Sequence, residues 1–332
     1  MAWTKNYASA KVGYHGSVGG KGNGVSMVRK IAGAVRTTLA CLMALSAFAQ
    51  RNFYQEALDK YQSKQYEEAL PLAEAALGAD RKNPAYSHLY GSILAALGQF
   101  YLAEEYLGKA IALAPDRPEF EYDLGALLHQ ERKYSEAVPV LKRAIELDPA
   151  NLTARLMLAR CYVLSYNELQ LPNFEELTLE QLNYIVKKDP RFPGVHHHLA
   201  LVYINTGELT KAIVELNTEL QYDPGDSQAR LELGETLLKL NQYRKAADEL
   251  QIAAKQAPRM PAIRFGLAKA YKADGQAAKA LAEARKCVEL DPQFAAGHYL
   301  LGQLYRDANQ PDLARQQFEL FRQLDNSRAP SP

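Results

Sequence analysis

The stretch PEFEYDLGALLHQERKYSEAVPVLKRAIELDPAN, from Pro118 to Asn151, decides the fold. It contains two amphipathic helical patterns, and each carries its small and apolar residues on one face. Those residues are Leu124, Gly125 and Leu128 in the first pattern, and Ala137, Leu141 and Ala144 in the second. Pro149 ends the unit because proline lacks the amide hydrogen that another helical turn needs. A lone helix pair cannot bury both apolar faces, so the stretch predicts neighbouring units of the same kind.

The same pattern recurs at a nearly constant interval along the chain. Prolines end the units at Pro115, Pro149, Pro190, Pro224, Pro258 and Pro292, and subtracting successive sequence numbers gives 34, 41, 34, 34 and 34. Alanine stands at one fixed distance before five of these prolines, and leucine stands at a second, shorter distance before four of them. These residues are Ala103, Ala137, Ala212, Ala246 and Ala280, and Leu107, Leu141, Leu216 and Leu250. Small residues let helices approach closely and leucines fill the space beside them, so these positions are predicted to form the core.

This repeat resembles the tetratricopeptide repeat family, whose units are about 34 residues long and contain two antiparallel helices. The resemblance implies an all-α fold, a right-handed superhelical solenoid of about eight helix pairs over residues 50–326. The tryptophan of the family is absent from every unit, because the only tryptophan is Trp3. The predicted units start at Gln50, Pro84, Pro118, Leu152, Pro193, Ser227, Pro261 and Ala295.

Residues 1–49 differ in composition from the repeats and are predicted to be a leader. They contain six basic residues and no acidic residue. Several of these basic residues precede an apolar run of about 13 residues that ends in Ala47-Phe48-Ala49, which is the layout of a secretory signal peptide. The run is shorter than the roughly 20 residues that span a bilayer. We expect translation to start at Met27, cleavage after Ala49 and export to the periplasm or the medium, with residues 327–332 forming a disordered tail.

Charge and cysteine content argue against two classes of interaction. The chain has a formal net charge of +1, and removing the six basic leader residues leaves 33 basic and 38 acidic residues. This mildly acidic balance gives no electrostatic reason to expect nucleic acid as the main partner. Cys161 and Cys287 lie three repeats apart, so no disulfide is expected between them, and Cys287 is interpreted as a small buried side chain.

The sequence contains none of the common catalytic or cofactor motifs, including GxSxG, the Rossmann glycine pattern, the EF-hand loop and CxxC. His196, His197 and His198 form the only histidine cluster. Consecutive helical residues point about 100° apart, so at most one or two of these imidazoles could reach a common metal ion. We therefore predict no enzyme, no cofactor and no metal site. A weaker alternative is a ligand or metal receptor that uses His197 and His198.

The family resemblance also places a binding groove. In this family the first helix of each unit lines a concave surface, and the matching positions here carry aromatic, cationic and histidine side chains. Such side chains at regular spacing suit an extended peptide or protein segment. Alternatively, the aromatic residues Tyr122, Phe265 and Tyr299 only pack between adjacent units. The predicted groove residues are Tyr54, His88, Tyr122, His129, Arg160, His197, Phe265, Lys269, Lys272, Tyr299 and Arg306.

The fourth unit is longer than its neighbours. The extra residues fall within 165–177 and are expected to form a loop or short helix, with Leu169, Leu171 and Phe174 packed inward and Glu175 and Glu176 pointing outward. The alternative is a longer turn that the fold tolerates without a specific contact. The most direct functional interpretation is an exported, non-catalytic scaffold that binds a peptide or protein in its groove. No small-molecule substrate is expected. Contact with a membrane is expected only if the leader is not cleaved. The alternative is a structural subunit of a cell-envelope assembly or secretion complex that docks through the 165–177 loop and the convex face.

Some members of the family hold the acidic C-terminus of a chaperone with lysine and asparagine in consecutive units. The corresponding positions here carry His88 and Ser92, then Tyr122 and Ala126. This chain therefore lacks that clamp, and a chaperone tail is not the expected ligand.

Overall fold

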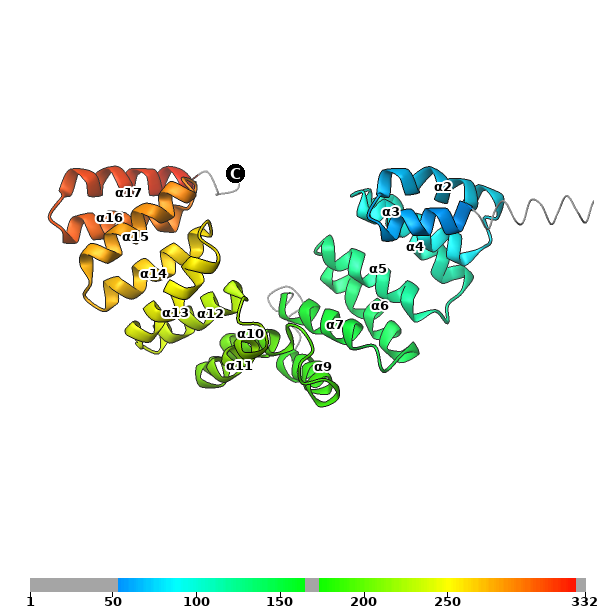
Figure 1. Cartoon of the computed structure of the whole chain (residues 1–332), viewed down its shortest axis with the longest axis horizontal. Coiled ribbons are helices and arrows are strands. Elements are labelled where there is room, and N and C mark those ends of the chain that lie inside the picture. The colour runs from blue at the N-terminus through cyan, green and yellow to red at the C-terminus, as the bar shows by residue number, and fades with distance from the viewer. Residues whose placement is uncertain (1–52, 165–172, 327–332) are drawn as a thin grey trace, which may run out of the picture. The chain divides into compact units, whose positions relative to one another are not determined.

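The computed structural model describes residues 53–164 and 173–326, and every regular element in these ranges is an α-helix (Figure 1). The prediction of an all-α fold is confirmed. The signal peptide, the insertion residues Leu169 and Leu171, and the predicted tail lie outside the described residues. The chain divides into two compact units, and the boundary between Tyr106 and Leu107 falls inside one helix.

The first unit is built from short antiparallel helices. They are a helix over residues 53–62, α2 (Tyr66–Ala79), α3 (Pro84–Ala96) and the part of α4 (Phe100–Leu113) that ends at Tyr106. The side chains of Ala57, Ala69, Ala73, Leu89 and Ile93 form its core.

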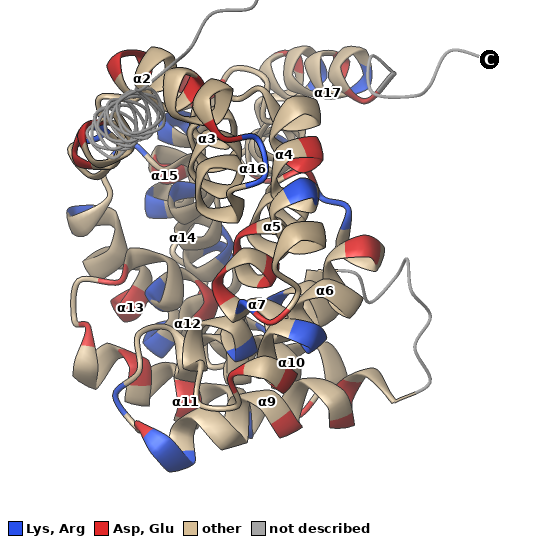
Figure 2. Ribbon diagram, turned by 90° about the vertical axis from the view of Figure 1, so that its right-hand side faces the viewer, with Lys and Arg blue, Asp and Glu red and all other residues tan. Residues whose placement is uncertain are grey.

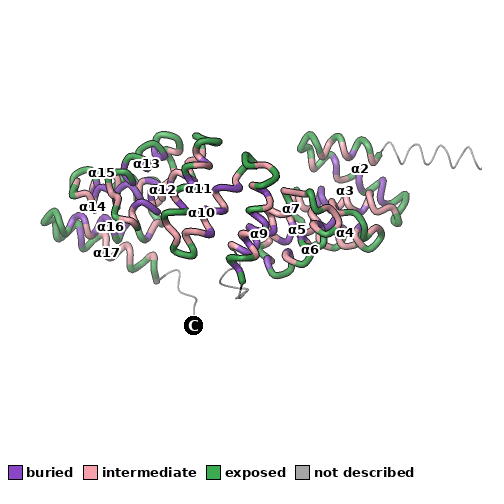
Figure 3. Tube along the Cα trace, turned by 90° about the horizontal axis from the view of Figure 1, so that it is seen from below, coloured by how far each residue is buried: buried purple, intermediate pink, exposed green. Residues whose placement is uncertain are grey.

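The second unit is a stack of helix pairs. Its helices after α4 are α5 (Pro118–Gln130), α6 (Tyr134–Leu147), α7 (Leu152–Leu164), α9 (Phe174–Lys188), α10 (Val195–Thr206), α11 (Leu209–Tyr222), α12 (Ser227–Lys239), α13 (Tyr243–Gln256), α14 (Pro261–Ala273), α15 (Ala277–Leu290), α16 (Ala295–Asp307) and α17 (Pro311–Asn326). From α5 onward each helix packs against the next, and first helices of successive pairs also meet, as in α5 with α7, α7 with α10, and α14 with α16. Stacking thus buries the apolar face that a single pair would leave exposed. Figure 3 shows buried residues recurring along the stacked helices, while exposed residues gather at the turns.

Local sequence explains where the first helices begin. Pro84, Pro118 and Pro261 occupy the first turn of α3, α5 and α14, where the missing amide hydrogen costs no hydrogen bond. At α12 the carboxylate of Asp226 accepts hydrogen bonds from the amides of Gln228 and Ala229, at 2.9 and 3.0 Å. The first helices α3, α5, α7, α12, α14 and α16 begin at the residues where units were predicted to start.

The fifth unit begins differently. Its first helix, α10, starts at Val195, shortly after Pro193, where the unit was predicted to start. Gly194 precedes the helix in the left-handed conformation, with φ of 76°, which favours glycine. The amide of Gly194 donates a hydrogen bond to the Glu219 carboxylate at 3.2 Å.

The repeated alanines and leucines form the core, as predicted. All nine are at most 1% exposed. Glycine is required where the leucine of the second helix presses against the first. A Cβ atom added to Gly125 would lie 2.6 Å from Cγ of Leu141, and one added to Gly234 would lie 2.5 Å from Cγ of Leu250. Neither leucine could keep its position beside a larger residue.

The insertion in the fourth unit is partly described. Phe174 is buried, as expected, in the core cluster that contains Leu158 and Tyr162, and Glu175 and Glu176 are exposed. Of the loop and the short helix that the sequence left open, these three residues adopt the helix. They make the first turn of α9, with both carboxylates near the positive end of the helix dipole.

Candidate functional site

The structure places the predicted groove residues on the first helices of their pairs, and two groups of them belong to the second unit. Phe265, Lys269, Lys272 and Tyr299 line a cleft between α14 and α16. Tyr122, His129, Arg160 and His197 lie on α5, α7 and α10. We call Tyr122, His129 and Arg160, together with His198 of α10, the Arg160 cluster, because the charge of Arg160 acts on the other three side chains.

The remaining predicted residues stand apart. Tyr54 and His88 belong to the first unit, where both are half-buried. The Tyr54 ring packs 5.1 Å from the ring of Tyr86, and the His88 carbonyl accepts a hydrogen bond from the Ser92 hydroxyl at 3.0 Å. Arg306 is exposed and lies 3.7 Å from a carboxylate oxygen of Asp307.

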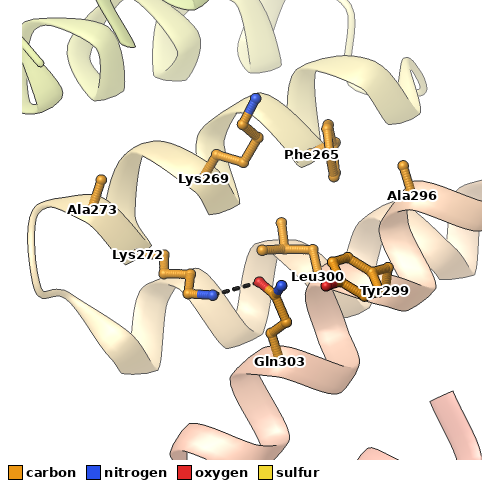
Figure 4. A pocket seen from close by; sticks show the side chains of 8 residues that line it. All are labelled: Phe265, Lys269, Lys272, Ala273, Ala296, Tyr299, Leu300 and Gln303. Carbon is orange, nitrogen blue, oxygen red and sulfur yellow. Dashed lines mark hydrogen bonds between the residues drawn. The ribbon is translucent and has the colours of Figure 1, made fainter. Parts of the chain in front are cut away.

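The cleft between α14 and α16 has a volume of about 500 Å³ and a largely apolar wall (Figure 4). Phe265 and the two lysines project from α14, opposite Tyr299 and Leu300 of α16. Its lining residues are Phe265, Lys269, Lys272, Ala273, Ala296, Tyr299, Leu300 and Gln303. Apolar walls with a few polar groups are typical of binding sites.

The two lysines of the cleft differ in how their charge is satisfied. The Lys272 ammonium donates a hydrogen bond to Oε1 of Gln303 at 2.6 Å and lies 3.7 Å from Asp307 (Figure 4). The Lys269 ammonium lies 5.4 Å from the centroid of the Phe265 ring, and it forms no ion pair with a carboxylate of the described residues. Lys269 therefore offers an exposed positive charge beside apolar surface.

The aromatic residues of the cleft both pack and remain accessible. The Phe265 ring lies 5.3 Å from Phe294, and the Tyr299 ring lies 5.8 Å from Phe318 and 5.1 Å from Phe321. Tyr299 is nevertheless 45% exposed, which is unusual for a side chain that only fills a core.

The Arg160 cluster combines one guanidinium with neutral groups. Burial raises the pKa of Tyr122, and Asp123 adds to the rise while Arg160 opposes it. Burial and then Arg160 lower the pKa of His129. Burial, followed by His197, Arg160 and His129, lowers the pKa of His198 to about 3. Both imidazoles are therefore neutral near pH 7. Two of their nitrogens, Nε2 of His129 and Nδ1 of His198, are buried without a hydrogen-bond partner.

The three consecutive histidines differ in their hydrogen-bond partners, although the rings of His197 and His198 stack with their centroids 5.5 Å apart. The His196 ring lies between Glu215, at 2.6 Å, and the carbonyl of Pro190, at 3.0 Å. Nε2 of His197 lies 2.8 Å from Glu232. Burial disfavours charge on His197, but the hydrogen bond and charge of Glu232, with nearby carboxylates, raise its pKa. Within the described ranges, no three His, Cys, Asp or Glu side chains are arranged to hold a metal ion.

Sequence reasoning missed several residues of these sites, among them Gln303 and His198. Gln303 stands at the same position of its unit as the predicted residues Arg160 and Lys269 do in theirs, so the same family positions could have identified it. His198 does not stand at a position that corresponds to any predicted groove residue, and the influence of the Arg160 charge on it emerges only from the structure. Its neighbour His197, which was predicted, is instead held by Glu232 of α12.

The described cysteines are not reactive thiols. Cys161 and Cys287 are buried and form no disulfide, and the burial predicted for Cys287 is confirmed. Burial raises the pKa of each thiol to about 12, so neither is a thiolate near pH 7.

Charge and hydropathy of the described helices also bear on the kind of partner. Lysine and arginine are interspersed with aspartate and glutamate along most helices (Figure 2). Such interspersed charge does not make the basic surface that nucleic-acid binding requires. No helix in the described ranges has the length and apolar character needed to cross a membrane.

Comparison with known proteins identifies the repeat. Family models described as tetratricopeptide repeat match residues 54–118, 128–167 and 231–293. Anaphase-promoting complex subunit 3 of Schizosaccharomyces pombe is 26% identical over 225 residues, which are 68% of this chain and 32% of that protein. The human protein O-mannosyl-transferase TMTC1 is 27% identical over 172 residues, 51% of this chain and 19% of that protein. The chain thus spans about a third or less of these relatives.

A solved structure of MamA, residues 41 to the end, from Desulfovibrio magneticus RS-1 is also similar. It is 24% identical, with a TM-score of 0.45, over 51% of this chain and 96% of that one.

Proposed function

Because this chain belongs to the tetratricopeptide repeat family, we propose that it is a non-catalytic scaffold that binds an extended peptide or protein segment along the first helices of its units. Proteins of this family are interaction scaffolds, and several first helices of this chain carry accessible aromatic or cationic side chains, such as Tyr299 and Lys269. The cleft between α14 and α16 is the observation that carries the proposal.

The chemistry of that cleft favours a segment with both an apolar and an acidic side chain. Tyr299, Phe265 and Leu300 offer apolar surface for a side chain of the partner. The Lys269 ammonium has no carboxylate partner among the described residues and can accept one from the partner. The amide of Gln303 can reach partner backbone groups when Lys272 turns toward a carboxylate.

A charge reversal in the cleft tests this function. Affinity purification with the native chain identifies the partner, and its dissociation constant is then measured for the double variant Lys269→Glu, Lys272→Glu. Two carboxylates in place of two ammonium groups repel an acidic segment, so we expect binding at least tenfold weaker, or about 1.4 kcal/mol. Circular dichroism should be unchanged, because neither lysine is buried in the core.

The matched control is Lys245→Glu with Lys279→Glu. These lysines are exposed on the second helices α13 and α15, and the variant carries the same change in net charge. We expect it to bind as the native chain does. An equal loss of affinity in both double variants would mean that net charge, and not the cleft, governs binding. Unchanged affinity in the cleft variant would remove the cleft from the function.

The non-catalytic part of the proposal has a chemical basis as well. The described cysteines have raised thiol pKa values, and the histidines of the Arg160 cluster are neutral with no serine or cysteine paired to them in the described ranges. One relative is named as a transferase, but the similarity covers only 19% of that protein. Nothing in the matched region assigns its transfer reaction to these repeats.

A second candidate is a structural subunit of a larger assembly. It is favoured by the relative named as a subunit of the anaphase-promoting complex. In this alternative, docking would use the 165–177 segment and the outer helices α9 and α11. The mass of the purified complex separates the two candidates, because a groove-bound peptide adds little mass and a stable assembly adds several subunits.

Export is the third part of the proposal, and it rests on the leader sequence alone. Basic residues followed by a short apolar run and Ala47-Phe48-Ala49 indicate cleavage by a signal peptidase. We expect Edman sequencing of the mature protein to begin at Gln50. Recovery of peptides from residues 1–40 in the mature protein would contradict this expectation.

A further inference from the structure

A second cavity lies beside the cleft between α14 and α16. It has a volume of about 450 Å³ and is lined by the turn between α14 and α15, the start of α15 and the end of α16. Leu281 and Leu304 contribute apolar wall, and Lys272 and Asp307, whose charged atoms lie 3.7 Å apart, are its charged residues. Lys272 also lines the cleft, so the two cavities share one side chain (Figure 4). We call the second cavity the α15 pocket.

The pocket lies where α15 begins at a small residue. Five of the other second helices, α2, α4, α6, α9 and α13, begin at an aromatic residue. These aromatic residues are Tyr66, Phe100, Tyr134, Phe174 and Tyr243. The helix α11 begins at Leu209 and α17 at Pro311, whereas α15 begins at Ala277. Ala277 and the nearby Gly275 both line the pocket and are solvent-exposed, so the pocket opens to the outside.

The pair α5 and α6 shows what an aromatic side chain does at this position. Tyr134 is 5% exposed and belongs to a core cluster that contains Cys161, with Val138 packed against it. Counted from the starts of their units, Cys161 corresponds to Leu304 and Val138 corresponds to Leu281. The apolar residues of the α15 pocket are therefore the counterparts of residues that pack in one cluster with the Tyr134 ring.

The rest of this turn also matches between the two pairs. The rings of His129 and Tyr134 have their centroids 5.5 Å apart, and the counterpart of His129 is Lys272. The turn residues Arg132 and Gly275, which also correspond, are both left-handed, with φ of 62° and 76°. The backbone of the turn is thus similar, and the side chain at the start of the second helix is the difference that leaves room for a ring.

We propose that the α15 pocket takes an aromatic side chain of the bound segment, so that the partner supplies the ring that α15 does not have. Leu281 and Leu304 offer apolar surface for the ring, and the Lys272 ammonium can make a cation–π contact with it. Asp307 can accept a hydrogen bond from a tyrosine hydroxyl. Because Lys272 lines both cavities, this aromatic residue is close, along the segment, to the residues that enter the cleft. The inference rests on the proposed function in assigning the ring to a bound segment.

The probe for this site is p-cresol, which has the ring and hydroxyl of tyrosine, so the first test does not need the partner. The full chain, isotope-labelled at its alanine methyl groups, is titrated with p-cresol and followed by NMR. A ring shifts the resonances of nuclei close to its face, so we expect saturable shifts for the methyl groups of Ala278 and Ala308, which line the pocket. The saturated analogue 4-methylcyclohexanol should bind roughly twofold or more weakly, because it makes no cation–π contact. Equal affinity for the two probes would overturn the assignment to an aromatic ring.

The variant Ala277→Tyr fills the pocket with a ring of the chain itself. We expect p-cresol to bind it about tenfold or more weakly, with an unfolding midpoint no lower than that of the native chain, because the same turn accommodates Tyr134. Ala277→Leu, which introduces the residue that begins α11, is a second blocking variant and should also weaken binding. The control is Ala282→Tyr, which adds the same side chain at an exposed position of α15 outside the pocket. It should bind p-cresol as the native chain does.

Two further results would overturn the inference: p-cresol causes no saturable shift at Ala278 and Ala308, or both blocking variants bind it as the native chain does. Neither result depends on the partner, so the scaffold function would stand. Once the partner is identified, Ala277→Tyr should bind it about tenfold or more weakly, and Ala282→Tyr should not. Unchanged affinity of Ala277→Tyr for the partner would show that the ring does not come from the bound segment. The variant Lys269→Glu, Lys272→Glu changes a residue of both cavities, so Ala277→Tyr is the variant that separates the pocket from the cleft.

Discussion

Replacing Leu250 with alanine is expected to lower the free energy of unfolding of the second unit by about 2–5 kcal/mol. Leu250 is fully buried on α13 and faces both neighbouring first helices. Added Cβ atoms on Gly234 of α12 and Gly266 of α14 would lie 2.5 and 3.3 Å from atoms of its side chain. Because glycines face it on two sides, no side chain at those two positions can move in to fill the cavity.

Urea denaturation followed by circular dichroism measures this loss, and Ile252→Ala is the matched control. Ile252 is on the same helix but 39% exposed, so its replacement should cost less than about 1 kcal/mol. Since each repeat contacts mainly its neighbours, Leu141→Ala beside Gly125 should behave like Leu250→Ala. A cost for Leu250→Ala no larger than that for Ile252→Ala would show that the glycine–leucine contact does not govern stability.

The repeat made this part of the fold predictable from the sequence. Gly125 with Leu141 and Gly234 with Leu250 recur at the same positions of two units, and the structure places each leucine against its glycine. Such contacts are set by residues within one unit, at the same sequence separation in both. The period therefore carries the information that determines them.

Irregular positions were less predictable. The period indicated that the fourth unit is longer, and Phe174 was correctly expected to be buried. It left open whether this segment forms a loop or a short helix, and the structure shows that residues from Phe174 onward belong to α9. Helix length here depends on acidic side chains in the first turn and on burial of Phe174, which are local features without a counterpart in the sister units.

The candidate sites were also only partly predictable from the sequence. Groove positions transferred from the family found Phe265, Lys269 and Tyr299, which the structure brings into one cleft. They did not show which cations are already paired. Lys272 is hydrogen-bonded to Gln303 of the next unit, whereas Arg160 has no acceptor within the described residues. Pairing depends on side-chain directions between adjacent units, and spacing alone does not determine those directions.

The second large effect concerns acid stability. Between pH 7 and pH 5 the native chain is expected to lose about 2 kcal/mol of unfolding free energy through His198 alone. The pKa of His198 is about 3 in the folded chain, and that of an unfolded histidine is about 6.5. Below about pH 6.5, His198 is therefore protonated in the unfolded chain and stays neutral in the folded chain. The stability contributed by neutral His198 is present above the unfolded pKa and falls as the pH drops toward the folded value.

The neighbouring groups fix how this effect must be measured. Besides burial, three groups disfavour a positive charge on His198 and so lower its pKa: His197 on its own helix, Arg160 of α7 and His129 of α5. The pKa of His129 is also lowered, so that residue acts in the same direction as His198. The pKa of His197 is raised, so its contribution is complete below the unfolded pKa and is lost as the pH rises through the folded value. The pH dependence of the native chain therefore sums contributions of opposite sign. The contribution of His198 is obtained only as the difference between the native chain and a variant.

Urea midpoints at several pH values between 5 and 8 for the native chain, His198→Gln and His197→Gln give that difference. Glutamine does not titrate, so His198→Gln should lose about 2 kcal/mol less than the native chain on going from pH 7 to pH 5. His197→Gln should lose more than the native chain, because it removes a group that gains stability in acid. Parallel pH curves for the native chain and His198→Gln would mean that the imidazole accepts a proton in the folded chain as readily as in the unfolded one. Burial and the charges of the neighbouring groups would then impose no penalty on protonation of His198.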